Sequence, residues 1–584
     1  MTDYFEVHER DGAARLGELR LSDPLTTPSL ADDVLEDAGS LWFHDREVPD
    51  GSDDVVTVLP HRAFPSGTPD EVQEAFAVDY PDVDYPSAAV VSPQTAENQG
   101  TDVYVLSGAP GFVGHGRAFV DAIITAREAI PADTALMLSG VATPGNAATL
   151  AYAGVDLVDT GKAVVSGTQG RYLTRDGNYD LDSLDELLCG CPRCQEAGSV
   201  EEFSREDCAE HNVTLLRAEL ATVRQQIRQG TLRDYIEAQA RHEQWHTATF
   251  RELDDRWGYL EQRTPLLRRA EMTAASEDTL RRVEIRRYAD RVTSRYRCRF
   301  REPLVLVPCS ARKPYSESQS HGQFHDAIQF RAHLASITSP IGVVPQELEL
   351  TYPAQHYDTV VTGRWTEGEK SFVAEVLRRY LARNEYPRII AHVPEDYREI
   401  VERVERDLDL DIEYTVEDHP TTVDSISNLM KTLDGELKYS RREREQNTVK
   451  AIADYMFGDG AGDELFEDVQ TTSRYPKLQV RSREGEQLAA MVPNYGVLAL
   501  TLAGAHHWVD SDVPTKRVEI DNFVPHGSVL APGVVDADDE IRIGDEVVVE
   551  GPAAFAVGRA EASGPEMAES TRGIAVEVRH VEEK

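Results

Sequence analysis

A thiol, an amine, a hydroxyl and an imidazole follow one another closely near the middle of this chain. They belong to Cys309, Lys313, Ser318 and His321, and they come directly after the apolar run 304–307. Such a run predicts a buried strand, and ligands usually bind at the carboxyl ends of strands in an α/β sheet. A thiolate can attack an electron-poor carbon, while an amine or an imidazole can transfer a proton. The stretch therefore indicates nucleophilic or acid–base chemistry.

Each of these residues also has a structural explanation. Cys309 could be a small buried side chain, Lys313 a solvated charge, and Ser318 the cap of a helix that begins near His321. Lys313 is, however, one of only nine lysines among the 60 lysine and arginine residues. Arginine cannot replace an acid–base amine, because it stays protonated. The retained lysine favours chemistry, and from the residues alone both explanations stay open.

A second group of residues has the chemistry of a zinc site. Cys189, Cys191 and Cys194 form a Cys-x-Cys-x2-Cys turn, and His211 follows on a predicted helix. Thiolate sulfur and imidazole nitrogen are the ligands of closed, tetrahedral structural zinc sites. Cys208 is a competing fourth ligand, and three reduced surface cysteines are the alternative. Because four protein ligands leave no open position, we expect the Zn²⁺ to be structural.

The composition limits the class of protein. The 584 residues are enough for several domains, and no apolar run is long enough to span a membrane. The acidic amino terminus does not resemble a signal peptide, and the clustered cysteines favour a metal over disulfides, so we expect a cytoplasmic protein. The net charge of −43, with very little lysine, is typical of proteins from salt-in halophiles. Molar salt screens charges within about 3 Å, so this acidity neither supports nor excludes an RNA partner.

Apolar patterning predicts the elements that position these residues. Strands are expected at 103–106 and 135–138 with an amphipathic helix at 117–130 between them, which indicates a parallel α/β domain. Long helices are expected over 205–300, and α/β alternation resumes near residue 304 and continues to about residue 420. A tail that begins near Lys516 has the short strands and the Gly, Pro and Asp turns of a small barrel. The expected fold class is a multidomain α/β protein.

The segments before and around the cysteines resemble the tRNA-guanine transglycosylases. The match is carried by 140–144 (GVATP), 154–160 (GVDLVDT) and 170–177 (GRYLTRDG), in the order of that family. The resemblance implies a degenerate TIM-barrel-like domain over 1–285 with a zinc-binding helical insertion. It also implies a homodimer, because relatives of this family pair through the region near the zinc.

One aspartate corresponds to the nucleophile of that family. It is the second aspartate of the middle motif, Asp159, which in the family forms a covalent intermediate with the ribose. The family's base-recognition motif is absent, since the corresponding stretch 106–112 has no aspartate. A nucleophile without its pocket cannot position a base. We therefore expect Asp159 to be vestigial or structural.

The central stretch resembles the archaeosine synthase family. The pattern Pro-Cys-x3-Lys-Pro-Tyr-x2-Ser-x2-His ends at His321, and the segments 338–345, 352–358 and 361–365 fit as well. The resemblance implies a catalytic α/β domain over 300–430, similar to the uracil-DNA-glycosylase fold. From the chemistry of its side chains we take Cys309, Lys313, Ser318 and His321 as the candidate catalytic residues, with Cys309 as a candidate nucleophile and Lys313 or His321 as alternative proton donors. Pro308, Pro314 and Tyr315 are the candidate substrate-binding residues.

The carboxyl-terminal part resembles the RNA-binding region of archaeal transglycosylases. Residues 455–462 (YMFGDGAG) match a small α+β domain, expected over 440–512, and 524–533 matches a PUA β-barrel, expected over 513–584. Such modules grip structured RNA largely by shape and backbone, so tRNA is the expected partner. The candidate phosphate contacts are Lys516, Arg517, Arg559, Arg572 and Arg579, and Arg559 is the one predicted to bind substrate.

These resemblances imply a tRNA-modifying enzyme. Its substrate would be tRNA that carries 7-cyano-7-deazaguanine at position 15 of the D-loop, and the reaction would add a nitrogen donor to the nitrile. Free lysine is the expected donor, with glutamine or ammonia as alternatives. A radical-SAM partner protein would complete a lysine route, since the chain lacks a Cys-x3-Cys-x2-Cys cluster. The alternatives are an active tRNA-guanine transglycosylase and a non-catalytic tRNA-binding factor.

Overall fold

The computed structural model describes residues 4–359 and 364–584 as a multidomain α/β protein built of two compact units. The first unit comprises Met1–Pro265, Ser528–Arg542 and Glu561–Val576, and the second comprises Leu266–Gly527, Ile543–Ala560 and Glu577–Lys584. Among the described helices, none combines the length and the apolar character that crossing a membrane requires.

A seven-stranded sheet forms the centre of the first unit. Its order is β4-β10-β9-β8-β7-β6-β5, and every neighbouring pair is parallel. The strands are β4 (Ser29–Leu30), β5 (Leu35–Asp37), β6 (Val56–Val58), β7 (Ser87–Val91), β8 (Val103–Leu106), β9 (Ala135–Leu138) and β10 (Leu157–Val158). The strands predicted at 103–106 and 135–138 are confirmed, and α2 (Gly116–Ala129) is the helix between them. Strands β6, β7 and β9 are buried throughout, as in parallel sheets covered on both faces.

One helix of the first unit lies between β9 and β10 in the sequence, and a run of helices follows β10. They are α3 (Ala147–Ala153), α4 (Gly161–Thr168), α6 (Arg205–Gln229), α7 (Leu232–Gln239), α8 (Gln244–Asp255) and α9 (Trp257–Arg263). A capping box between Ser204 and Asp207 starts α6, and Gly230, with φ of 69°, ends it. The helices expected over 205–300 are correct as far as Arg263. Beyond it, Pro265 and a short strand, β13 (Met272–Ala274), interrupt the helical pattern before α10 (Val283–Ser294).

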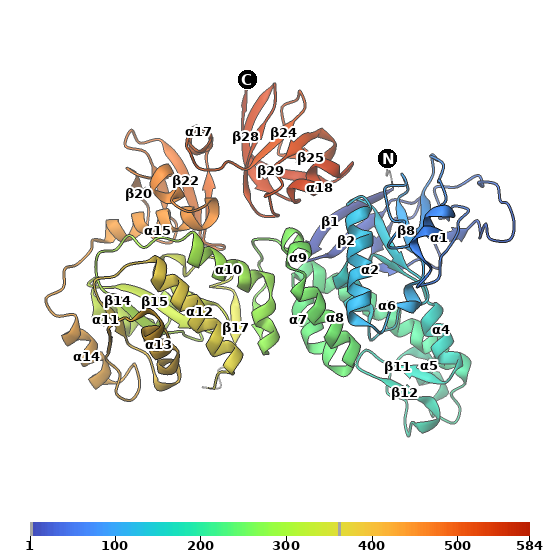
Figure 1. The fold of residues 1–584 in the computed structure, drawn as a ribbon, viewed down its shortest axis with the longest axis horizontal. Helices are drawn as coiled ribbons and strands as arrows, with labels where there is room; N and C mark the ends of the chain where they lie inside the picture. Colours follow the sequence, from blue (N-terminus) through green and yellow to red (C-terminus); the bar gives the residue numbers. More distant parts are fainter. Residues whose placement is uncertain (1–3, 360–363) are drawn as a thin grey trace. The chain divides into compact units, whose positions relative to one another are not determined.

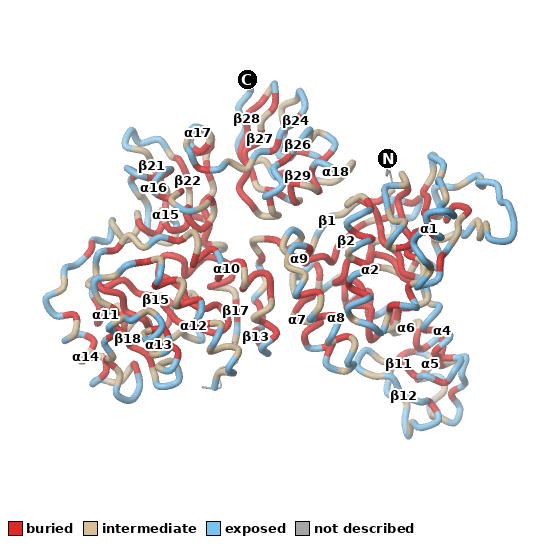
Figure 2. Tube along the Cα trace, viewed as in Figure 1, coloured by how far each residue is buried: buried red, intermediate tan, exposed pale blue. Residues whose placement is uncertain are grey.

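A five-stranded sheet in the order β16-β15-β14-β18-β19 organises the second unit. Its strands are β14 (Leu304–Pro308), β15 (His333–Thr338), β16 (Gly342–Pro345), β18 (Ile389–Ala391) and β19 (Ile412–Tyr414), and only the β15–β16 pair is antiparallel. Helices α11 (Gln319–Ile328), α12 (Glu367–Arg383), α13 (Glu395–Leu408) and α14 (Val423–Thr432) accompany it (Figure 1). The strands are largely buried, whereas the helices expose one side (Figure 2). The α/β alternation predicted from residue 304 is therefore present.

The second unit continues into smaller β-structures. A four-stranded antiparallel sheet comprises β20 (Gln470–Thr472), β21 (Gln479–Arg481), β22 (Gln487–Val492) and β23 (Val497–Leu500), with α15 (Arg441–Phe457) before it in the chain. In the tail, β24 (Arg517–Ile520) pairs with β27 (Glu546–Glu550), which pairs with β28 (Ala554–Ala560). The tail is thus rich in short strands, as its turn residues predict.

A fully buried ion pair lies at the amino end of β15. Nε2 of His333 is 2.9 Å from a carboxylate oxygen of Glu347, and the hydroxyl of Tyr386 is 2.9 Å from Nδ1. Burial alone lowers the pKa of His333, but the charge of Glu347, together with Cys298 and the hydrogen bonds to both residues, raises that pKa to about 10. The folded protein therefore binds the imidazole proton of His333 more tightly than the unfolded chain does.

We expect Glu347→Gln to destabilise the second unit by about 3–5 kcal/mol, because it leaves a buried imidazolium without its counter-charge. The pair's contribution is complete below the unfolded histidine pKa of about 6.5 and is lost as pH rises toward 10. Calorimetry at several pH values measures both effects. Glu413→Gln, which removes one of the two carboxylate partners of Arg388 near the surface, is the control and should cost about 1 kcal/mol or less. If Glu347→Gln changed neither the stability nor its pH dependence, His333 and Glu347 would not form a charged pair.

Candidate functional site

The polar loop of the second unit begins where the buried strand β14 ends. β14 is the middle strand of the sheet, with β15 and β18 on its two sides. The backbone N–H of Cys309 continues this pairing by donating to the carbonyl of Ile337 at 3.2 Å. Central strands position the residues at their carboxyl ends with little freedom. The sheet therefore fixes where the loop starts.

Cys309 is half-buried and its sulfur contacts a tyrosine. Sγ lies 3.3 Å from the hydroxyl of Tyr397 on α13. Burial raises the pKa of Tyr397 well above its ordinary value, so this hydroxyl stays protonated and can donate a hydrogen bond to a thiolate. Tyr397 also packs against Trp365, with ring centroids 4.6 Å apart. Of the neighbouring segment 361–365 noted in the sequence, residues 361–363 lie outside the described part of the chain.

Lys313 places its ammonium group inside the protein. Its Nζ is buried, lies 3.8 Å from the centroid of the Tyr357 ring, and has no hydrogen-bond partner among the described residues. Burial lowers the pKa of Lys313, while the charges of Cys309 and Asp358 act in the opposite direction. A buried ammonium without a partner is costly. Such an arrangement is typical of a side chain whose hydrogen-bond partner is supplied by the substrate.

His321 and Ser318 hold the loop in shape. The hydroxyl of Ser318 accepts a hydrogen bond from the backbone N–H of His321 at 3.2 Å, which makes it the N-cap of α11. Nε2 of His321 is 3.1 Å from the carbonyl of Pro308 and donates to it. Burial lowers the pKa of His321 to about 4, so the ring is neutral at pH 7. The structure thus joins the start and the end of the motif through these two side chains.

A chain of hydroxyl groups lies beneath the loop. The hydroxyl of Tyr357 is 2.6 Å from that of Tyr315 and 2.7 Å from that of Thr338, and Tyr315 stacks on His321 with ring centroids 5.0 Å apart. Pro314 precedes Tyr315 and starts its short 3-10 turn. The sequence had marked Tyr315, but not Tyr357 as the platform under Lys313 or Tyr397 as the partner of Cys309. Both tyrosines come from distant elements, so only the fold reveals them.

The four predicted metal ligands come together in the first unit. They are Cys189, Cys191, Cys194 and His211, with one ligand atom of each within 4.8 Å of the others. Sγ of Cys191 is 3.5 Å from Sγ of Cys194 and 3.4 Å from Nδ1 of His211. Ligand atoms of a tetrahedral zinc ion lie about 3.5–4 Å apart. The residues therefore fit a metal ion with four protein ligands.

The surroundings of the cluster support metal binding. Nε2 of His211 donates to the carbonyl of Leu173 at 3.0 Å, which leaves Nδ1 for a metal. Burial lowers the pKa of His211 to about 4 and raises that of Cys194 to about 12, so the Cys194 thiolate would form here only beside a cation. The competing ligand Cys208 is outside the cluster, because its thiol donates to the carbonyl of Arg171 at 3.4 Å.

Asp159 lies at the carboxyl end of β10 beside a cavity of about 510 Å³. Its carboxylate accepts hydrogen bonds from the backbone of Gly140 at 2.9 Å, from the backbone of Gly161 at 3.0 Å, and from the hydroxyl of Ser139. Asp32 also lines the cavity. The stretch 106–110, which lacks the aspartate of the family's base-recognition motif, also lines this cavity. The three donors to Asp159 agree with a structural role.

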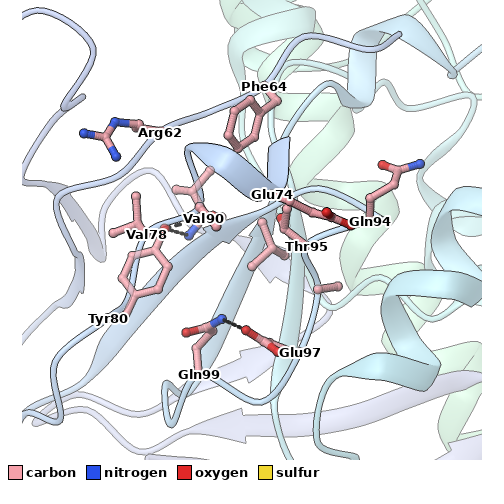
Figure 3. A pocket seen from close by; sticks show the side chains of 13 residues that line it. Arg62, Phe64, Glu74, Val78, Tyr80, Val90, Gln94, Thr95, Glu97 and Gln99 are labelled. Carbon is pink, nitrogen blue, oxygen red and sulfur yellow. Dashed lines mark hydrogen bonds between the residues drawn. The ribbon is translucent and has the colours of Figure 1, made fainter. Parts of the chain in front are cut away.

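A smaller cavity of about 250 Å³ in the same unit is lined in part by polar side chains (Figure 3). The hydroxyl of Tyr80 donates to the carbonyl of Val90 at 2.8 Å and accepts from its N–H at 3.1 Å. The amide of Gln99 donates to Glu97 at 3.0 Å. The side chains of Tyr80 and Gln99 are therefore engaged by other residues of the cavity lining.

The basic residues of the tail are mostly engaged within the protein. Lys516 forms an ion pair with Asp545 at 2.5 Å, Arg517 with Glu550 at 2.6 Å, and Arg579 with Glu546. The guanidinium of Arg559 lies 5.7 Å from the centroid of the Tyr495 ring. Lys516, Arg517 and Arg579 are therefore weak candidates for phosphate contacts, and the structure does not bring Arg559 into the loop after β14.

Comparisons with known protein families give four matches along the chain. The matching families are "Queuine tRNA-ribosyltransferase" over residues 85–244, "Domain of unknown function (DUF5591)" over 285–433, "Patch-forming domain C2 of tRNA-guanine transglycosylase" over 447–514, and "PUA domain" over 517–581. The loop after β14 falls within the second of these matches.

Relatives match over the whole chain. The archaeosine synthase of Haloferax volcanii is 68% identical over 100% of both chains, and the archaeosine synthase subunit alpha of Methanosarcina acetivorans is 40% identical over 100% of both. The tRNA-guanine(15) transglycosylase of Methanothermobacter thermautotrophicus is 27% identical over 79% of this chain and 68% of its own. These identities agree with the motif from Pro308 to His321 and with the cysteine cluster. The chain belongs to the archaeosine synthase family.

Proposed function

We propose that this chain is an archaeosine synthase that adds a nitrogen donor to the nitrile of 7-cyano-7-deazaguanine in tRNA, at position 15 of the D-loop. The observation that carries the proposal is the buried ammonium of Lys313, which has no hydrogen-bond partner in the described chain and lies within electrostatic range of Cys309. A nitrile needs a proton at its nitrogen and a nucleophile at its carbon. The loop offers both.

The proposed reaction has two steps, addition of Cys309 to the nitrile and displacement of Cys309 by the amine donor. Cys309 loses its proton to solvent and adds to the nitrile carbon as a thiolate while Lys313 delivers a proton to the nitrogen, R–C≡N + Cys–S⁻ + Lys–NH3⁺ → R–C(=NH)–S–Cys + Lys–NH2, and solvent then reprotonates Lys313. The amine of the donor then attacks the same carbon and the thiol leaves, giving R–C(=NH)–NH–R′ and free Cys309. Lysine is the proposed donor, with glutamine or ammonia as alternatives. A lysine adduct would then need a radical-SAM partner to release archaeosine.

The remaining loop residues have supporting roles in this proposal. His321 and Ser318 hold the loop through Pro308 and the first turn of α11, and Pro314 and Tyr315 border the place of the base. We assign the domains as 1–285 (a degenerate TIM-barrel-like transglycosylase domain), 300–430 (a catalytic, uracil-DNA-glycosylase-like domain), 440–512 (a small α+β domain) and 513–584 (a PUA β-barrel). The PUA and transglycosylase matches support tRNA as the partner, and Arg559 remains a proposed contact. A homodimer is proposed from the family resemblance alone.

The cysteine cluster is proposed to hold a structural Zn²⁺, because its four ligands leave no open position. We expect Cys194→Ala to bind one equivalent less zinc than the unmodified protein and to expose the segment from β11 (Arg171–Leu173) to α5 (Pro192–Ala197) to protease. Structural zinc contributes on the order of 10 kcal/mol to small domains. Cys208→Ala is the matched control and should keep its zinc, since that thiol lies outside the cluster. Loss of zinc in both variants would contradict the ligand assignment.

The test of the function is a reaction at molar KCl with tRNA that carries 7-cyano-7-deazaguanine. Isotopically labelled lysine, glutamine and ammonia are supplied in separate reactions. The tRNA is then digested, and the masses of its nucleosides are measured by mass spectrometry. We expect a nucleoside heavier by one lysine, and none on tRNA with guanine at the same position. Formamidine from glutamine or ammonia would retain the synthase and change the donor. Tight tRNA binding without any product would support the non-catalytic binding factor.

The cavity beside Asp159 favours a second candidate function, base exchange by transglycosylation. Incorporation of labelled guanine into tRNA tests it directly. Exchange that is abolished by Asp159→Asn would establish this activity, whereas no exchange together with lysine addition would confine Asp159 to a structural role.

A further inference from the structure

We propose that His242, Glu243 and His246 form a second divalent-metal site, with Zn²⁺ as the best-suited ion and one coordination position open to water. One ring nitrogen of each histidine and one carboxylate oxygen of Glu243 lie within 4.8 Å of one another. All three residues belong to the first unit and lie outside the cysteine cluster. Two imidazoles and a carboxylate are a ligand set that zinc and other first-row divalent ions accept.

The local backbone brings the three side chains together. A 3-10 segment, η3 (Ala240–His242), leads into α8, which begins only at Gln244. Glu243 therefore precedes the helix with extended backbone, at φ −142° and ψ 137°, and its carboxylate oxygen lies 3.6 Å from Nε2 of His246. The two histidine rings are 4.9 Å apart and nearly perpendicular, at 82°.

His246 is a buried imidazole beside the carboxylate of Glu243. The residue is 1% exposed, and its Nδ1 is buried with no hydrogen-bond partner among the described residues. Its Nε2 faces the Glu243 oxygen at 3.6 Å, which is beyond hydrogen-bond distance. A metal ion held by both atoms would join two groups that do not bond to each other directly.

The surroundings of His242 agree with this role. Its Nδ1 contacts the carbonyl of Gln239, which leaves Nε2 as the ligand atom. Histidine ligands in proteins usually donate their second N–H to such a carbonyl. A Cβ placed at Gly145 would lie 3.1 Å from this Nε2, so the glycine keeps the ligand side of the ring uncrowded.

The ligand count determines the class of the site. Three protein ligands leave zinc a fourth position, which water or another oxygen donor fills. The side chain of Glu243 is 54% exposed, so the site borders solvent. It therefore differs from the cysteine cluster, where four protein ligands enclose the ion.

The test is metal content of the full-length protein after equilibrium dialysis against Zn²⁺, read by mass spectrometry of the metal. We expect two zinc ions per chain, and one in His246→Ala. Glu243→Gln should weaken the second ion at least about 10-fold, which is the loss seen when even an outer partner of a metal ligand is removed. His44→Ala, which removes an exposed histidine of the same unit, should keep both ions.

Co²⁺ distinguishes the two sites by absorbance. The cysteine cluster gives sulfur-to-cobalt charge-transfer bands, and the second equivalent should add only weak visible bands, which His246→Ala removes. One metal ion per chain in the unmodified protein, or two in both variants, would overturn the proposal. If His246→Ala fails to fold, Glu243→Gln decides, because its side chain is exposed and makes no contact that the fold requires.

Discussion

Lys313→Ala should lower kcat for nitrile addition by about 10²–10⁴-fold, the range for loss of a positioned acid or base. The ammonium is buried over the ring of Tyr357 and meets no hydrogen-bond acceptor in the described residues, so a substrate atom is its natural partner. Lys313→Arg should be nearly as inactive, because arginine keeps the charge and cannot transfer the proton. Single-turnover rates with saturating donor measure the effect, and tRNA affinity is measured separately.

The pH profile separates proton transfer from simple charge. Burial lowers the pKa of Lys313 below the ordinary lysine value of 10.5. If the ammonium form donates the proton, the rate falls as pH rises through this lowered pKa, and the fall disappears in Lys313→Arg. Lys370→Ala is the control, since that lysine pairs with Glu367 and Glu399 on the helix surface. Full turnover in Lys313→Arg would show that Lys313 does not transfer a proton in the reaction.

The sequence predicted the parts of the site that are local. The motif from Pro308 to His321 spans one strand end, one turn and one helix start, so its order along the chain is also its order in space. Ser318 as a helix cap was an alternative that the residues themselves offered, and the structure adopts it. The cysteine turn and His211 were likewise predictable, because thiolate spacing and a helix-borne imidazole suffice to specify a closed site.

The parts that the sequence did not predict depend on distant elements. Tyr357 and Tyr397 reach the loop from β17 (Tyr357–Thr359) and from α13, and a tyrosine in an apolar pattern is more often only a core residue. The cavity beside Asp159 escaped notice for the same reason, since strands far apart in the chain enclose it. Local sequence also does not show that Lys516 and Arg579 pair with buried carboxylates, so their contact with phosphate stays a prediction.

Cys309→Ala should lower kcat by about 10³-fold or more if the reaction passes through a thioimidate, because the variant lacks the attacking atom. The covalent step also predicts an intermediate. With the nitrile-bearing tRNA and no amine donor, a protein–tRNA adduct should accumulate on denaturing gels and disappear when lysine is added. Mass spectrometry of the digested adduct should place the nucleoside on Cys309.

Two further variants separate the nucleophile from its surroundings. Tyr397→Phe removes the hydroxyl that lies 3.3 Å from the sulfur, so it should slow the adduct's formation about 10-fold without abolishing it, as expected for one lost hydrogen bond to a charged group. Cys298→Ala, the control thiol of the same unit, should leave the adduct unchanged. If Cys309→Ala turns over at the normal rate, no thioimidate forms and the donor amine attacks the nitrile directly. In that case the chemistry of the site reduces to the proton that Lys313 delivers.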